Sequence, residues 1–266
     1  MIFPQSAPRV AGLVSRHDFV LEGLAPDPSA GLPLGNGEIA ASLFGGPGLL
    51  ALRVRKNDAH IGDIRLHIPG HESRTPRPAT PDPRPATVLG LYDATARASL
   101  LEGIEVEAFV AAARELIILR VRSRRGDSLP AALELASPGP ASQFRCDGPF
   151  RYARQDPRDG SSAALCGFVY GARSRSEIRA DAVVAAFAVP PFGECLILTG
   201  VAGSAVADPV LLARAEVERA LPLGHLLLQR EHAVSWERFW STLEDGDPET
   251  TDYRDIYSSR VTPRAA

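Results

Sequence analysis

From about residue 32 to residue 205 the chain is a succession of short β-type segments separated by turns. Segments Leu49–Arg55 and Ile64–Ile68 alternate apolar and polar side chains, which is the pattern of a strand with one buried face. No helical pattern interrupts this succession. Many strands joined by short turns must bury their apolar faces against one another, so the pattern predicts a mainly β fold of two stacked antiparallel sheets.

The expected strands can be placed along the chain. One early strand is expected at Asp18–Glu22. Later strands are expected at Val88–Leu101, Ile104–Ala113, Leu116–Arg124, Ala131–Ala136, Ala163–Tyr170, Glu177–Arg179, Ala182–Ala188 and Glu194–Val201. Two long loops should separate them. Residues 69–87 contain six prolines, which cannot pair inside a sheet, and a Gly/Pro-rich loop follows Ala136 through residue 160.

The pattern changes after residue 205. Asp208-Pro209 predicts a helix start, with Asp as N-cap and Pro in the first turn, and Pro222 and Gly224 should end that helix. A second helix is expected from His225 to about Leu243. We therefore expect a β domain at residues 1–205, linker helices at 206–245 and a polar tail at 246–266.

The second helix carries Trp236, Phe239, Trp240 and Leu243 on one face. A sugar could stack on such a stripe, but aromatic residues at helical spacing more often pack into a core. If this face were exposed, it would indicate a missing partner. If it were folded back on the β body, the chain would be self-contained.

Composition excludes several classes of function. The chain has 266 residues, a net charge of -3 and no basic stripe interleaved with aromatics, so no nucleic-acid partner is expected. No apolar run approaches the roughly 20 residues that span a bilayer, and no signal peptide is evident, so a cytoplasmic protein without a membrane partner is expected. Cys146, Cys166 and Cys195 are widely spaced, which predicts neither a disulfide framework nor a metal site. No cofactor is indicated.

Two short segments are candidates for a binding site. Gly35-Asn36-Gly37 suits a tight turn, and the same turn could present the Asn36 amide to a partner surface. Lys56, Asn57, Asp58 and His60 lie where a strand ends, and their dense donors and acceptors suit sugar hydroxyls. An Asx-type turn with a solvated lysine is the alternative for that segment. No pair of carboxylates can be named as catalytic acid and base from the sequence.

These segments resemble a known group of enzymes. Leu32–Ala41 reads LPLGNGEIAA and resembles the start of the N-terminal domain in glycoside hydrolases of family 95 and their relatives of family 65. Lys56–His60 is similar to their K-x-D-A-W segment, with His60 where an aromatic residue is usual. His232–Ser241 resembles the helix that leaves that domain, so the similarity spans most of residues 15–243.

The resemblance implies a β-supersandwich followed by linker helices and an (α/α)6 barrel, which carries the general acid and base. It also implies α-glycosidic substrates, with α-L-fucosidase the best-known family 95 activity. About 26 residues follow Trp240, whereas a six-hairpin barrel needs several hundred by its repeat count. The family's catalytic carboxylates therefore have no counterpart here, and the catalytic residues are unknown.

The leading hypothesis is an N-terminal β-sandwich domain of a glycoside-hydrolase-like protein. Its partner would be a carbohydrate, or a helical catalytic domain or partner chain whose sugar site it scaffolds or borders, and it would be inactive alone. Asn36, Lys56, Asn57, Asp58 and His60 would contact the sugar or the partner. The alternatives are an active α-L-fucosidase-like glycosidase, which needs two carboxyl groups roughly 5–10 Å apart, a stand-alone carbohydrate-binding module, and a truncated product without function.

Overall fold

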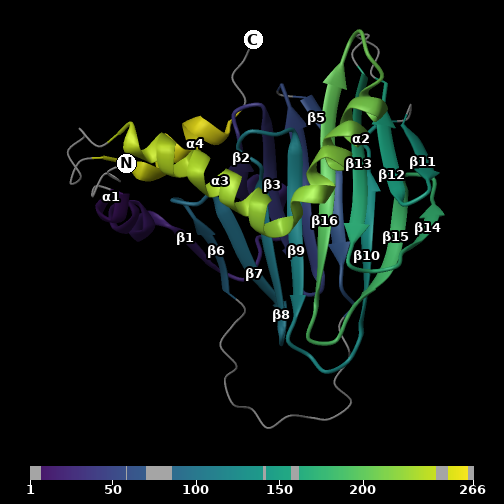
Figure 1. Ribbon diagram of the computed structural model, residues 1–266, viewed down its shortest axis with the longest axis horizontal. Coiled ribbons are helices and arrows are strands. Elements are labelled where there is room, and N and C mark those ends of the chain that lie inside the picture. The colour runs from purple at the N-terminus through teal and green to yellow at the C-terminus, as the bar shows by residue number, and fades with distance from the viewer. Residues whose placement is uncertain are drawn as a thin grey trace.

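The computed structural model describes residues 7–57, 59–69, 86–139, 142–156, 162–243 and 251–262. Two antiparallel sheets are stacked face to face, and helices lie across the outer side of one of them (Figure 1). The expected mainly β sandwich is confirmed. Of the helices in the described part of the chain, none combines the length and apolar character needed to cross a bilayer.

The larger sheet contains nine strands within the described residues. In spatial order they are β1 (Phe19–Glu22), β6 (Ala86–Gly90), β7 (Thr95–Leu101), β8 (Ile104–Val110), β9 (Leu116–Ser123), β16 (Glu194–Ser204), β13 (Ser162–Tyr170), β12 (Phe150–Gln155) and β11 (Gln143–Asp147).

The smaller sheet contains seven strands of the described chain. Their order is β14 (Arg175–Ile178), β15 (Ala182–Val189), β10 (Leu129–Ala136), β5 (Ala59–His67), β4 (Leu49–Lys56), β3 (Ile39–Gly46) and β2 (Leu32–Gly35). Burial alternates residue by residue along β3, because successive side chains of a strand point to opposite faces. Ile39, Ala41 and Leu43 therefore face the core between the sheets, and Ala40 and Ser42 face outward.

Two sequence predictions about strands were wrong. The single strand expected at Val88–Leu101 is two strands, β6 and β7, joined by a turn at residues 91–94 in which Ala94 has a φ of 45°. The Gly/Pro-rich loop expected through residue 160 contains β11 and β12, which pair around Gly148 with a φ of 56°. Glycine adopts this left-handed backbone without a steric penalty, so a tight turn fits there.

The described helices are α1 (Ala7–Val14), α2 (Pro209–Ala220), α3 (Gly224–Ser241) and α4 (Tyr253–Val261), with the short 3₁₀ turns η1 (Ser15–His17), η2 (Pro28–Ala30) and η3 (Leu221–Leu223). The two expected helices are α2 and α3. Asp208 caps α2 as predicted, since its carboxylate accepts the Val210 amide at 2.9 Å. Helix α2 packs on β13 and β16 of the larger sheet.

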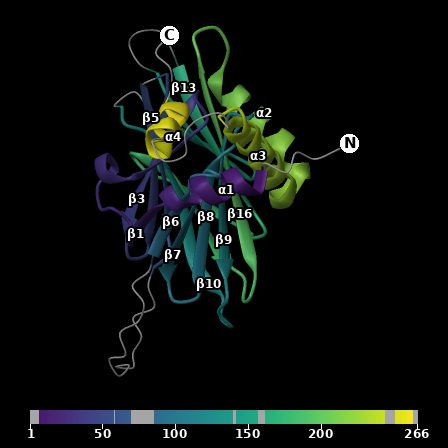
Figure 2. The ribbon, with the colours of Figure 1, turned by 90° about the vertical axis from the view of Figure 1, so that its left-hand side faces the viewer.

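The aromatic stripe of α3 is part of the core. Trp236 and Trp240 are 2% and 0% exposed, and the Trp236 ring stacks on Tyr257 of α4 at 5.3 Å between centroids. The packing interpretation of this stripe is confirmed for Trp236 and Trp240, whereas Phe239 is partly buried and Leu243, at the end of the stripe, is 36% exposed. Helix α4 lies within the segment expected as a polar tail, and its Tyr253, Tyr257 and Val261 belong to the same core. Figure 2 shows α1, α3 and α4 together at one side of the sandwich. The division into a β domain, linker and tail stays a prediction.

Replacement of Trp240 by alanine should destabilise the fold by about 3 to 5 kcal/mol, the usual cost of deleting a large buried aromatic. Leu226, on the same helix but 77% exposed, gives the matched control, and Leu226→Ala should change stability by less than about 0.5 kcal/mol. Denaturant unfolding of both variants measures this. Equal effects would contradict the assignment of Trp240 to the core.

Stability should fall as the pH drops from about 6.5 toward about 4, because of His232. This side chain is 2% exposed, and burial lowers its pKa from 6.5 to about 4. The unfolded chain therefore binds a proton in this range that the folded chain does not bind. His232 should then account for about 2 to 3 kcal/mol of stability lost between pH 7 and pH 4.5.

The measurement compares the pH dependence of unfolding for a His225→Gln protein with and without His232→Gln. The shared His225→Gln change is needed because burial lowers the pKa of His225 as well. The double variant should lose less stability on acidification than the single variant. Parallel pH profiles would show that His232 titrates normally in the folded protein.

Candidate functional site

One end of the sandwich carries a pocket where the two sheets and α2 meet. Its volume is about 420 Å³, and its lining combines the β2–β3 turn, the β8–β9 connection and α2. We call it the turn-end pocket. It is lined by Asn36, Glu38, Ala112, Ala113, Arg114, Glu115, Leu212, Glu216 and Arg219.

Asn36 fixes the position of this end of the molecule. Its Nδ2 donates to the carbonyl oxygens of Ala111 at 2.9 Å and Arg114 at 3.0 Å, and its Oδ1 accepts the amides of Glu38 at 3.0 Å and Ile39 at 2.9 Å. The side-chain amide therefore joins the turn of one sheet to the β8–β9 connection of the other. All four of these bonds are internal, so the geometry supports the turn interpretation of Asn36.

Both glycines beside Asn36 are needed, Gly35 because there is no room for a side chain and Gly37 because its backbone φ is positive. A Cβ on Gly35 would collide with the carbonyl oxygen of Val261, so α4 can approach β2 only at a glycine. Gly37 has a φ of 92°, which suits glycine because side chains disfavour this region. Gly35-Asn36-Gly37 therefore forms a turn that packs against α4 on one side and is hydrogen-bonded to the β8–β9 connection on the other.

Lys56 of β4 does not line the turn-end pocket but contacts Glu115, which does. Its Nζ forms an ion pair with Glu115, and only 10% of the Lys56 side chain is exposed. Arg219 forms a second ion pair with Glu216. With Glu38, three carboxylate side chains of the described chain line one pocket. Carboxylates accept and guanidinium groups donate hydrogen bonds, as recognition of sugar hydroxyls requires.

The other predicted residues do not join this pocket. Asn57 is exposed in the β4–β5 turn with a φ of 48°, and Asp58 lies outside the described residues. The solvated lysine of the alternative interpretation is wrong, because the Lys56 side chain is only 10% exposed. His60 pairs across the ladder with Arg55 rather than with Lys56. Because neighbouring side chains on a strand point to opposite faces, Lys56 points toward Glu115 and His60 faces the outer surface of the smaller sheet.

On that outer surface His60 belongs to an ionic network around Asp63. The Asp63 carboxylate accepts Arg53 Nε at 3.2 Å and Arg65 at 2.9 Å, and the His60 Nε2 lies 3.0 Å away. Burial raises the pKa of Asp63, but the hydrogen bonds from His60, Arg53 and Arg65 outweigh this and hold the pKa well below its ordinary value. Asp63 therefore stays ionised and orients these side chains.

Sequence reasoning missed the pocket residues Glu38, Arg114, Glu115, Glu216 and Arg219. Sheet stacking and the α2 docking bring them together, so local sequence carries no signal for the cluster. Within the described ranges, no three His, Cys, Asp or Glu side chains converge in a way that could hold a metal ion.

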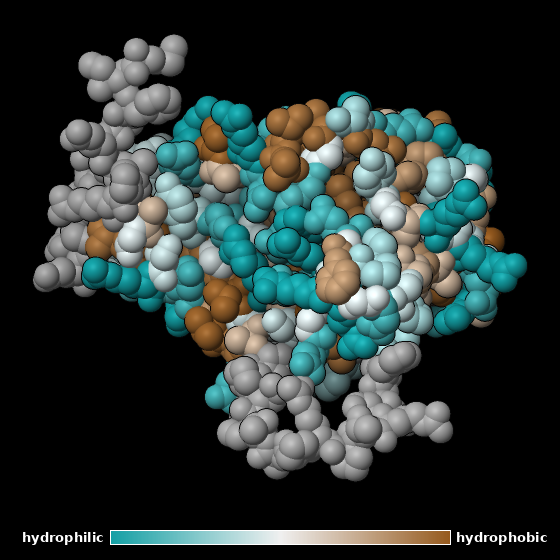
Figure 3. Space-filling view, turned by 60° about the horizontal axis from the view of Figure 1, so that its bottom comes forward, coloured by the Kyte–Doolittle hydropathy of each residue, from teal (hydrophilic) through white to brown (hydrophobic). Residues whose placement is uncertain are grey.

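Apolar side chains are exposed on the two helices beside the pocket. Leu212 lines the turn-end pocket and is 44% exposed. Other side chains exposed on α2 and α3 are Leu211, Leu226, Leu227 and Val234. We call these five residues the helix leucine surface. Figure 3 shows that hydrophobic side chains gather in clusters on one face of the molecule, among hydrophilic ones.

No known sequence family matches the chain, and no curated protein matches it either. Solved structures do match. A protein described as a kojibiose phosphorylase from the human microbiome superposes with a TM-score of 0.59 and 8% identity, over 85% of this chain and 38% of that one. The family GH92 inverting mannosidase of Bacteroides thetaiotaomicron superposes with a TM-score of 0.57 and 12% identity, over 95% of this chain and 39% of that one.

The chain therefore spans about two fifths of the length of these solved proteins. At this level of identity the similarity shows a shared fold. The β-sandwich with its trailing helices is a domain fold found in proteins related to glycoside hydrolases.

Asn36→Asp should destabilise the protein by about 2 to 3 kcal/mol, because a carboxylate oxygen replaces the Nδ2 donor and faces the carbonyls of Ala111 and Arg114. Asn57→Asp makes the same chemical change in an exposed turn and should alter stability by less than about 0.5 kcal/mol. Thermal or denaturant unfolding at pH 7 compares the two. If Asn36→Asp leaves the free energy of unfolding unchanged, the hydrogen bonds from Asn36 to Ala111 and Arg114 do not hold the turn in place.

Proposed function

We propose that this chain is the β-sandwich domain of a glycoside-hydrolase-like protein and that its turn-end pocket borders a sugar site completed by a helical domain. The observation that carries the proposal is the position of Leu212, which lines the polar pocket and is also an exposed apolar side chain of α2. A partner that packs on Leu212 would also cover the pocket.

The chemistry of the pocket fits a bordering role. Glu115 and Glu216 are held by Lys56 and Arg219, so their oxygens are placed before a ligand arrives. Ordered acceptors and donors of this kind orient sugar hydroxyls. The exposed leucines provide apolar area that a soluble protein usually covers with a partner.

The proposal also includes a class of substrate and a kind of partner domain. The LPLGNGEIAA segment favours an α-glycoside, with α-L-fucosides first among them, and a family 95-like (α/α)6 catalytic domain in the same or another chain. Asn36 then acts by holding the pocket wall, and Lys56 by orienting Glu115. By itself the domain is without hydrolytic activity. Its cytoplasmic location stays a prediction.

An active glycosidase is the second candidate, and the three glutamates of the turn-end pocket favour it. Such an enzyme needs one carboxyl group as acid and another as base or nucleophile, roughly 5–10 Å apart. Glu38, Glu115 and Glu216 would have to supply that pair. This candidate predicts turnover by the isolated chain, whereas the leading one predicts binding alone.

The test titrates the isotope-labelled chain with L-fucose, D-mannose and D-glucose and follows backbone amide shifts. Saturable shifts are expected at Glu38 and in the β8–β9 connection, with weak affinity because half of the site is absent. Glu38→Gln should weaken binding about threefold to tenfold, the effect of one charge-assisted hydrogen bond. Glu237→Gln, an exposed glutamate of α3 outside the pocket lining, should leave binding unchanged.

The same preparation is assayed with aryl α-glycosides, including the α-L-fucoside. No turnover is expected. Turnover that Glu38→Gln or Glu115→Gln abolishes would favour the glycosidase candidate over the bordering role. Shifts that are absent, or that spread evenly over the surface, would refute the sugar site itself.

A further inference from the structure

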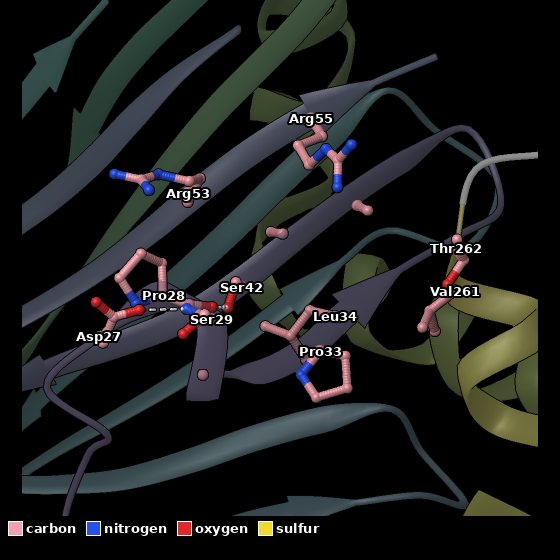
Figure 4. A pocket seen from close by; sticks show the side chains of 13 residues that line it. Asp27, Pro28, Ser29, Pro33, Leu34, Ser42, Arg53, Arg55, Val261 and Thr262 are labelled. Atoms are coloured by element: carbon pink, nitrogen blue, oxygen red, sulfur yellow. Dashed lines mark hydrogen bonds between the residues drawn. The ribbon is translucent and has the colours of Figure 1, made fainter. Parts of the chain in front are cut away.

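A cavity on the outer face of β3 and β4 is lined by charged side chains that already have partners. It has a volume of about 620 Å³ and includes Asp27, Ser29, Arg53 and Arg55 in its lining (Figure 4). Arg53 donates to Asp63 at 3.2 Å, and Asp27 accepts the Ser29 amide at 2.7 Å. Arg55 also has an interaction of its own. A charged ligand would have to displace these contacts, so the cavity is less suited to binding than the turns at one end of the sandwich.

Phe192 lies in the turn that joins β15 to β16 and combines two unusual properties. Its φ is 50°, in the left-handed region that bulky side chains disfavour. It is also 75% exposed, so burial of the ring does little to offset this strain. Strained backbone of this kind is found mostly at functional positions, which makes Phe192 a candidate contact for a ligand.

The turn around Phe192 is held by backbone hydrogen bonds. The Phe192 amide donates to the carbonyl of Arg125 at 2.9 Å. The Gly193 amide donates to Pro190 at 3.1 Å, and the Gly193 carbonyl accepts the Ser123 amide at 2.8 Å. Two of these bonds connect the β15–β16 turn to the end of β9. The position of Phe192 is therefore set in the free protein, which lowers the cost of ordering it on binding.

The ring of Phe192 rests on Gly126 of the β9–β10 turn. A Cβ added to Gly126 would lie 3.3 Å from Cζ and 3.5 Å from Cε2 of the ring, so the ring approaches this glycine closely. Most of the ring is nevertheless open to solvent. We call Phe192, Gly126 and the two residues that flank this glycine, Arg125 and Asp127, the aromatic tip.

The residues that flank Gly126 supply hydrogen-bonding groups. Arg125 donates through Nε and Nη2 to the two carboxylate oxygens of Asp127, at 2.9 Å each, and both side chains reach solvent. Arg125 Nη1 makes no hydrogen bond within the described residues. A carboxylate can accept about four hydrogen bonds, so the pair with Arg125 does not exhaust Asp127. The aromatic tip therefore combines an open ring with donors and acceptors.

The charges at the aromatic tip favour a neutral ligand. Arg125 is bonded to Asp127, and the neighbouring Arg124 is bonded to Glu105 at 2.8 Å. An anion would have to compete with these carboxylates for the guanidinium groups. Binding at the tip therefore has to come from contact with the ring and from neutral hydrogen bonds.

A single pyranose ring matches the size of the aromatic tip better than a protein surface does. A stable protein interface covers about 800 Å² on each partner, whereas one phenylalanine supplies about 150 to 250 Å². Within the described turns at residues 102–103, 124–128 and 190–193, Phe192 is the only large hydrophobic side chain that is exposed. A pyranose has an apolar face of C–H groups and a rim of hydroxyls, which suit an open ring beside donors and acceptors.

We propose that the aromatic tip binds a neutral pyranose unit, which stacks an apolar face on Phe192 and directs hydroxyl groups toward Arg125 and Asp127. The tip holds one unit of a glycan on the surface of the protein. This site goes beyond the function proposed above, because it needs neither the turn-end pocket nor a helical partner.

Strand β9 separates the two sites. Its eight residues, Leu116–Ser123, run from the β8–β9 connection at the turn-end pocket to the aromatic tip, about 25 Å at the usual rise per residue of a strand. Figure 1 shows the β9–β10 and β15–β16 turns at the bottom of the molecule, whereas α2 begins near the top. One sugar unit cannot contact both sites, so they can be tested separately.

Titration of the isotope-labelled chain with methyl β-D-glucopyranoside, sorbitol and cyclohexanol tests the proposal. The glucoside should give saturable amide shifts at Gly126 and Gly193. It should bind about threefold to tenfold more tightly than sorbitol, which has hydroxyls but no ring, or cyclohexanol, which has a ring with one hydroxyl. The affinity should change little as salt rises from about 50 to 200 mM, because the ligand carries no charge to be screened.

Phe192→Asn removes the aromatic face and suits the left-handed backbone, since asparagine tolerates a positive φ. It should weaken binding of the glucoside about threefold to tenfold, the usual effect of one aromatic contact. Phe192→Tyr keeps the ring and should bind normally. Leu226→Asn makes a similar change at a side chain of α3 that is 77% exposed and should leave binding unchanged. Thermal unfolding checks that each variant is folded.

Equal affinity for the glucoside and for sorbitol or cyclohexanol would overturn the proposal, because the tip would then not recognise a sugar ring. Normal binding by a folded Phe192→Asn protein would overturn it too, as would the absence of shifts at Gly126 and Gly193. Glu38→Gln should leave the shifts at the tip unchanged. Failure of the turn-end pocket and failure of the aromatic tip are therefore separate results.

Discussion

The contact between α3 and the β6–β7 turn is the interaction on which the arrangement of the helices depends. Trp240 Nε1 lies 3.2 Å from the carbonyl oxygens of both Leu91 and Tyr92, and His232 Nε2 lies 2.8 Å from that of Asp93. The turn carbonyls thereby gain partners in a buried setting, where an unpaired polar group is costly. The helix in turn is fixed in position on the sandwich.

From this contact the packing extends to the end of the chain. Trp236 stacks on Tyr257, whose hydroxyl donates to the carbonyl of Pro33 at 3.0 Å. Helix α4 is thereby held against β2, where Gly35 allows its close approach. The same edge strand leads into the turn of Asn36, so the aromatic core of α3 and α4 supports one wall of the turn-end pocket.

The sequence predicts an element correctly where one local pattern is enough to identify it. Alternation over Leu49–Arg55 predicted β4, and the Asp208-Pro209 cap predicted the start of α2. Alternation over Ile64–Ile68 found only the second half of β5, which begins at Ala59. The β6–β7 turn was missed because its stabilising donors, Trp240 and His232, lie more than a hundred residues away in sequence. Helix α4 was missed because it is short and largely polar, with Tyr253, Tyr257 and Val261 buried and Ile256 partly buried against the core.

The features of the candidate site also fall into those that the sequence predicts and those that only the tertiary structure shows. The sequence by itself determined that Asn36 sits in a glycine turn, that Trp236 and Trp240 are buried and that the chain is a mainly β sandwich, because turn chemistry and periodicity are local properties. Only the tertiary structure decided that Lys56 meets Glu115 while His60 joins Asp63 on the opposite face, and that Glu38 and Glu216 share a pocket. Side-chain direction alternates along a strand. Which residues meet across two stacked sheets depends on strand register and on how the sheets pack, and neither is specified by neighbouring residues in the sequence.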